Sequence, residues 1–170
     1  GVFRVENHII SKKCDLVFVE FAVNDQGQKT EKRIRTREGL LRKLLSGGRT
    51  DVVIVYTFSR NMYGEMKENK VPQTILDFEL LANHYQLSSV WMGLKALNDV
   101  RQGKMKWKEW LPDGRVHPEN RGSLSYAESV IQYLEDALSV EANADKTDKK
   151  LPAPYNDKCW EQTYQLPFEK

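Results

Sequence analysis

The sequence predicts an α/β protein with a parallel sheet and helices on both faces, a three-layer α/β/α sandwich. Short, almost continuous apolar runs alternate along the chain with longer stretches whose apolar residues recur at helical spacing. Alternation of strand and helix implies right-handed crossovers, which place a helix layer on each side of the sheet. The 170 residues, 40% hydrophobic and 29% charged, suffice for one packed domain.

The first half of the chain contains two expected helices and two expected strands. Residues 2–10 show helical spacing of apolar side chains. The run 16–23 is nearly all apolar, as expected of a strand buried on both faces. A second helix is expected over 30–46, ended by the glycine at 47, and a second strand over 52–58.

The second half continues the alternation and then changes character. We expect a helix from Pro72 to Tyr85, a strand over 89–94, a long irregular loop over 95–119 and a helix over 122–140. After this helix the composition turns to Ala, Asn, Asp and Lys and then becomes rich in proline. We therefore expect residues 141–170 to form a linker followed by an extended tail, with the start of another module as the alternative for the last twenty residues.

The expected topology of residues 1–140 lacks a strand before its first helix. Three strands are also few for a sheet of this kind. We expect a strand–helix–strand portion of roughly 30 or more residues upstream of Gly1. Residues 1–140 would then be the C-terminal part of a larger α/β domain.

Composition excludes several classes of protein. A net charge of +2 is too small to indicate binding to nucleic acid or a membrane surface, and no apolar run is long enough to span a membrane. The cysteines, Cys14 and Cys159, exclude a disulfide-rich scaffold and are compatible with a reducing cytoplasm. With His8 and His84 they show no metal-ligand spacing, and no glycine-rich loop indicates a nucleotide, so we expect no metal and no cofactor.

The stretch from Lys29 to Arg49 is strongly basic, with eight basic and two acidic residues. The plainer interpretation is the solvated face of the second helix. Binding of phosphate or an acidic polymer is the alternative.

Two segments carry residues suited to chemistry. Asn24 and Asp25 end the first apolar run, and Asp113 and His117 lie in the loop before the last helix. Open α/β sheets bind ligands beyond the carboxyl ends of their strands. A carboxylate that fixes the tautomer of an imidazole makes that imidazole a general base. A segment of either kind, taken alone, is most often an ordinary turn or loop.

These segments resemble conserved blocks of the SGNH, or GDSL-like, hydrolases. Residues 15–25 are similar to the third block of that family, and residues 113–122 to its fifth, which has an Asp-x-x-His-Pro pattern. The resemblance covers Gly1 to about Val140, including a Gly-x-x-Arg start to the first helix. It implies a flavodoxin-like α/β/α ester hydrolase that acts on a small-molecule or carbohydrate ester, an O-acetylated carbohydrate being one such substrate.

The resemblance also implies roles for single residues. Asn24 would donate its side-chain amide to an oxyanion, His117 would be the general base toward a serine, and Asp113 would orient His117. Three residues separate Asp113 from His117 where the family has two, so we expect a bulge near Gly114. The family's Gly-Asp-Ser nucleophile block is absent from these residues, and only Ser59, just past a strand, invites a test.

Two aromatic residues complete the candidate site. Trp107 and Trp110 lie in the loop that leads to His117, where they would either stack on a sugar or grip an acyl chain, or close the loop over the sheet. The leading hypothesis is a serine ester hydrolase whose nucleophile lies upstream, with the present chain alone inactive. The alternative is a non-catalytic module that binds a glycan or a protein.

Overall fold

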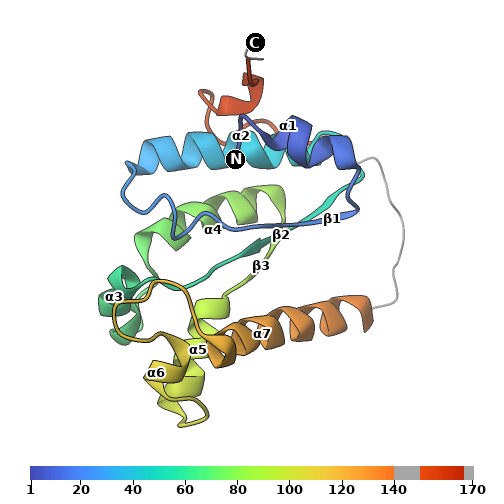
Figure 1. The fold of residues 1–170 in the computed structure, drawn as a ribbon. Helices are drawn as coiled ribbons and strands as arrows, with labels where there is room; N and C mark the ends of the chain where they lie inside the picture. The colour runs from blue at the N-terminus through green and yellow to red at the C-terminus, as the bar shows by residue number, and fades with distance from the viewer. Residues whose placement is uncertain (140–149, 167–170) are drawn as a thin grey trace, which may run out of the picture. The chain divides into compact units, whose positions relative to one another are not determined.

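The computed structural model describes residues 1–139 and 150–166. Within these residues the sheet has three strands, β1 (Leu16–Val19), β2 (Asp51–Val55) and β3 (Ser88–Val90), in the order β1-β2-β3 (Figure 1). β1 and β2 are parallel, with Leu16 opposite Asp51 and Val19 opposite Ile54. The predicted α/β class with a parallel sheet is confirmed.

The helices follow the predicted order, with three additions. The helices are α1 (Val5–His8), α2 (Thr30–Leu45), α3 (Tyr63–Lys67), α4 (Gln73–Tyr85), α5 (Met92–Arg101), α6 (Trp107–Trp110) and α7 (Asn120–Ser139), and the additions are α3, α5 and α6. Single 3₁₀ turns lie at Ile10–Lys12, Arg60–Met62 and Trp160–Gln162. The expected loop over 95–119 is wrong, because it contains most of α5 and all of α6. Ala96 and Leu97 bury one face of α5, which also ends the third strand earlier than expected.

Two compact units make up the described chain. The first comprises Gly1–Ile54, Gln73–Ser88 and residues 150–166, and the second comprises Val55–Pro72 and residues 89–139. The expected linker over 141–150 lies almost wholly outside the described residues. No helix in the described part of the chain is both long and apolar enough to cross a membrane.

In the first unit, β1 is less buried than the sequence predicts. Val19 is buried, but Leu16 and Phe18 are 39% and 40% exposed. The expectation of a strand buried on both faces is wrong here because Leu16 and Phe18 share one face of β1, and that face is only partly covered. Among the described residues, β1 also has a partner strand, β2, on one side only. One edge of β1 therefore keeps its backbone groups unpaired within the sheet.

The described C-terminal residues pack on α2 in the same unit. The buried Glu38 carboxylate accepts hydrogen bonds from the Tyr85 hydroxyl at 2.6 Å, from the Asn156 amide at 2.9 Å and from the Tyr155 amide. Burial, together with the adjacent Glu38 carboxylate, raises the pKa of Tyr85. Segments more than a hundred residues apart in sequence are thereby joined.

In the second unit, α5 and α7 are joined by a buried carboxylate. Asp99, 2% exposed, accepts hydrogen bonds of 2.6 Å from both Lys95 Nζ and Ser125 Oγ. Burial opposes ionisation of Asp99, but these hydrogen bonds outweigh it and lower the pKa of the carboxyl group. The carboxylate therefore holds the two helices together in its charged form.

Replacing Gly39 with alanine tests the packing of the C-terminal segment on α2. A Cβ at this position would lie 2.4 Å from the Trp160 backbone, whereas one at Gly47 would meet nothing within 4 Å. We expect Gly39→Ala to lower the free energy of unfolding by roughly 1–3 kcal/mol through overpacking. Denaturant titration of both variants measures this, and equal midpoints for Gly39→Ala and Gly47→Ala would contradict the packing.

Candidate functional site

Asn24 lies in a turn that follows β1, at the carboxyl end of the strand. Its side chain is exposed, and within the described residues the structure records no hydrogen bond to it. The turn closes through a bond of 3.3 Å from the Asp25 amide to the Phe21 carbonyl. Both donor hydrogens of the Asn24 amide are thus available to a ligand.

Arg37 of α2 holds the two ends of this turn. Its guanidinium donates to both carboxylate oxygens of Asp25, with Nε 3.0 Å from Oδ2, and to the Phe21 carbonyl at 3.3 Å. The same group donates to the Thr74 carbonyl at 2.6 Å and to Thr74 Oγ1 at 2.8 Å. Its Cζ lies 4.6 Å from the centre of the Phe78 ring, and the side chain is 2% exposed. Arg37 therefore ties the turn to α4.

Two further contacts hold the backbone on either side of Asn24. Thr74 Oγ1 donates to the Ala22 carbonyl at 2.9 Å. Arg33 Nη1 donates to the Gln26 carbonyl at 3.2 Å, while its Nε donates to Asp77 at 2.8 Å. The backbone around Asn24 is thus bonded to buried side chains, although the Asn24 side chain itself is not.

The basic stretch from Lys29 to Arg49 was expected to form a solvated helix face, and this is wrong for three of its basic residues. Arg33, Arg37 and Lys43 are 6%, 2% and 7% exposed. Each is buried because the fold supplies an acceptor: Asp77, Asp25 and the Thr163 carbonyl, respectively. For Arg33 and Arg37 the sequence signal was their helical spacing with Leu41 and Leu44, which places them on the apolar stripe.

Asp113 and His117 lie in the second unit, in the turns between α6 and α7. Both are exposed, and in the described chain no hydrogen bond joins them. The Asp113 side chain is 82% exposed and lies 4.0 Å from Arg60 Nη2. Gly114 has a φ of 72°, a left-handed conformation that suits the bulge expected there. Asn24 belongs to the other unit, so the structure describes the two parts of the candidate site separately.

The loop before Asp113 is anchored on the second unit. Arg60 Nη2 donates to the Leu111 carbonyl at 3.0 Å and to the Pro112 carbonyl at 2.7 Å. The anchor fixes the chain immediately before Asp113, and the turn that follows is exposed.

The two tryptophans differ in exposure. Trp110 is fully buried, with its ring centre 4.4 Å from that of Phe58 and its Nε1 donating to Tyr126 at 3.4 Å. Trp107 is half-buried and packs edge-on against Trp110 and Tyr63. The geometry favours the structural alternative for Trp110 and leaves only Trp107 with surface to offer a substrate.

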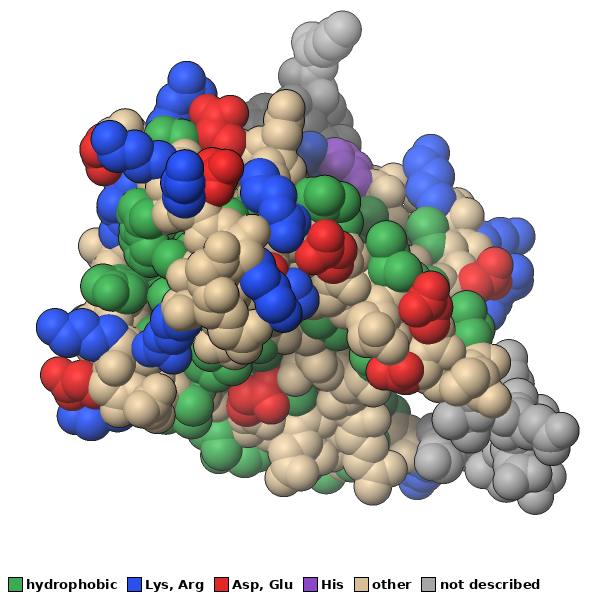
Figure 2. Space-filling view, turned by 90° about the horizontal axis from the view of Figure 1, so that it is seen from below, with side chains coloured by type: hydrophobic (Ala, Val, Ile, Leu, Met, Phe, Trp, Pro, Cys, Tyr) green, Lys and Arg blue, Asp and Glu red, His purple; other side chains and the backbone are tan. Residues whose placement is uncertain are grey.

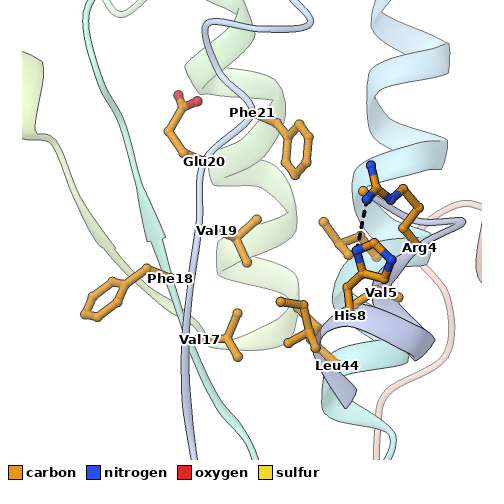
Figure 3. A pocket seen from close by; sticks show the side chains of 12 residues that line it. Arg4, Val5, His8, Val17, Phe18, Val19, Glu20, Phe21 and Leu44 are labelled. Atoms are coloured by element: carbon orange, nitrogen blue, oxygen red, sulfur yellow. Dashed lines mark hydrogen bonds between the residues drawn. The ribbon is translucent and has the colours of Figure 1, made fainter. Parts of the chain in front are cut away.

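A hollow of about 330 Å³ lies beside β1 in the first unit. Figure 3 shows Val17 and Val19 directed toward Val5 and Leu44, while Phe18 points to the opposite side of the strand. Among its lining residues, Arg4 and His8 bond to each other at 3.1 Å. The hollow does not include Asn24, and its lining is mainly apolar.

The described residues offer little to a metal or a polyanion. No group of three or more His, Cys, Asp or Glu side chains in this part of the chain is arranged to hold a metal ion. Figure 2 shows Lys and Arg side chains interspersed with Asp and Glu on the face drawn, rather than gathered into one basic field.

Comparison with known proteins identifies similar structures but no family. No protein-family model and no curated protein sequence matches the chain. Among solved structures, it is similar to a two-domain esterase active on acetylated mannans, co-crystallised with mannopentaose, with 31% identity and a TM-score of 0.71 over 95% of the present chain. A second crystal structure of a two-domain esterase active on acetylated mannans has 31% sequence identity and a TM-score of 0.70 over 94% of the present chain.

The likeness supports the α/β/α class and an esterase-like fold. The chain spans only 40% of the length of these esterase structures.

Alanine substitutions at the two tryptophans separate a packing role from a surface role. We expect Trp110→Ala to lower the free energy of unfolding by roughly 3–5 kcal/mol, because the ring is wholly enclosed. The loss for Trp107→Ala should be smaller, because this ring is only half-buried. Thermal or denaturant unfolding gives both values, and a larger loss for Trp107→Ala would contradict the burial described above.

Proposed function

We propose that this chain is part of a serine ester hydrolase of the SGNH type, in which Asn24 contributes to the oxyanion hole. The observation that carries the proposal is the exposed, unbonded Asn24 amide on a turn whose backbone is held by buried side chains. An oxyanion hole needs donors that are in place before the reaction starts. Likeness to an esterase over 95% of the chain supports the reaction class.

The proposed reaction is acyl transfer to a serine followed by hydrolysis. The serine Oγ attacks the carbonyl carbon of the ester and passes its proton to His117, and the carbonyl oxygen becomes an oxyanion that accepts a hydrogen bond from Asn24. Collapse of this intermediate breaks the bond to the alcohol, which leaves with the proton from His117. Water then attacks the acyl-enzyme in the same manner and releases the acid.

Asp113 is proposed to orient His117 for both proton transfers. The two side chains are exposed and unbonded to each other in the described chain. Catalytic hydrogen bonds are often long or poorly aligned without substrate and shorten in the substrate complex. The left-handed Gly114 gives the turn between them the freedom that such an adjustment needs.

The nucleophile is proposed to lie outside these residues. No Gly-Asp-Ser block occurs in the 170 residues. β1 has one edge without a partner strand among the described residues, and an additional parallel strand there would end beside the Asn24 turn. A serine following such a strand would meet Asn24 at the same edge of the sheet.

The proposed substrate is an O-acetylated carbohydrate. The similar esterase is active on acetylated mannans. The aromatic surface of Trp107 is suited to stacking on a sugar ring, and no cofactor is needed for the chemistry.

We expect the full-length protein to hydrolyse 4-nitrophenyl acetate and to release acetate from acetylated mannan. Asn24→Ala should lower kcat by about 10²–10³, because one oxyanion donor is lost. His117→Ala should lower it at least as much, because base and nucleophile act as a unit. Steady-state kinetics on 4-nitrophenyl acetate measures kcat for both variants.

Matched substitutions serve as controls for these two residues. Asn83→Ala, on an exposed position of α4, and His8→Ala, on the exposed side of α1, should leave the rate at the wild-type value. Wild-type rates for Asn24→Ala and His117→Ala would refute the proposal. A full-length protein that hydrolyses neither ester would instead support the non-catalytic binding module.

A further inference from the structure

We propose that Arg37 is a positioning residue for the Asn24 side chain, which it holds through Asp25 and the backbone of residues 21–25. This inference rests on the proposed role of Asn24 in ester hydrolysis. Arg37 itself is 2% exposed and therefore out of reach of a substrate.

The contacts of Arg37 define a rigid frame. Its guanidinium donates to the Asp25 carboxylate, the Phe21 carbonyl, and the carbonyl and hydroxyl of Thr74. The N–H donors of the Arg37 guanidinium all lie in one plane on a single rigid group, so the acceptors that they bind cannot shift independently. A lysine ammonium at position 37 would be a point charge and could not bridge the three residues together.

Asn24 lies between two of the points that this frame fixes. Phe21 and Asp25 are the first and last residues of the turn, and each bonds to Arg37. Thr74, bonded to Arg37 at 2.8 Å, also fixes the Ala22 carbonyl at 2.9 Å. The path of the chain through Asn24 is therefore set from both sides, and with it the point from which the side-chain amide projects.

A gain in stability alone does not explain why a buried arginine occupies position 37. A buried ion pair often stabilises a fold no more than apolar residues of the same volume, because both charges lose their hydration. What a guanidinium adds is geometry, in the form of several directed hydrogen bonds from one rigid group. A small displacement of a catalytic group can cost about 10²-fold in rate, which makes that geometry valuable here.

Arg42 provides a matched control on the same helix. It donates to Glu161 at 2.7 Å, to the Tyr85 hydroxyl at 3.2 Å and to the Pro152 carbonyl at 2.7 Å. It thus bonds several acceptors as Arg37 does, but none of them belongs to the Asn24 turn. Loss of its contacts should affect stability without affecting the site.

The test compares Arg37→Lys with Arg42→Lys in the full-length protein. Arg37→Lys should lower kcat about tenfold or more and leave KM unchanged, because the amide acts only on the transition state. Arg42→Lys should leave both constants unchanged. Thr74→Ser, which keeps the hydroxyl, should retain more activity than Thr74→Val, which removes it. Denaturant unfolding shows how much stability each variant loses.

A double-mutant cycle separates positioning from a general structural effect. In the Asn24→Ala background, Arg37→Lys should cause no further loss of kcat, because the group that it positions is gone. The side-chain amide of Asn24 gives a readout independent of activity: its NMR signals, identified by their absence in Asn24→Ala, should shift or broaden in Arg37→Lys and stay in place in Arg42→Lys.

The possible failures are distinguishable. Full activity in Asn24→Ala would refute the proposed function, and the amide signals would still test the positioning of Asn24. The positioning role is overturned if Arg37→Lys leaves the Asn24 signals unchanged. It is equally overturned if the loss of kcat in Arg37→Lys persists undiminished in the Asn24→Ala background.

Discussion

Two buried arginines on one helix organise the first unit. Arg33 and Arg37 carry positive charges that are almost completely removed from water, a state that is costly unless each charge is paired and hydrogen-bonded. Asp77 on α4 and Asp25 after β1 provide the opposite charges. Because helix, strand end and second helix each supply part of the two pairs, none of them can move away without exposing an unpaired charge.

That constraint bears directly on the candidate site. A turn beyond a strand is ordinarily among the more mobile parts of a fold. Here the carbonyls that flank Asn24 are acceptors in a largely buried hydrogen-bond network, and such networks favour a single conformation. The exposed amide of Asn24 is therefore carried on a rigid support, as electrostatic stabilisation of a transition state requires.

The fold was largely predictable from the sequence because its main elements have strong periodic signals. α2, α4 and α7 begin and end within about two residues of the expected positions, since each carries an apolar stripe and a clear start or stop. α3 and α6 were missed because they have only five and four residues, and α5 was missed because its first residues continue the apolar run of the third strand. β1 was expected to be buried on both faces because an apolar run does not reveal whether each face of the strand will be covered.

The candidate site was predictable only in part. The placement of Asn24 at a strand end follows from the strand itself. The role of Arg37 does not, because its partners Asp25 and Thr74 lie 12 and 37 residues away, and only the folded chain brings them together. Trp110 was ambiguous for a related reason: an aromatic residue in a loop has the same sequence signature whether it is enclosed or exposed.

The attachment of the C-terminal residues to α2 has a consequence for biosynthesis. Arg42 bonds Glu161, which follows it by 119 residues, and Glu38 bonds the amides of Tyr155 and Asn156. A ribosome adds these partners long after α2 has been made. Until then the Glu38 carboxylate lacks two of its donors, so the nascent first unit is incomplete. The second unit, encoded between the parts of the first, can finish folding before the first unit does.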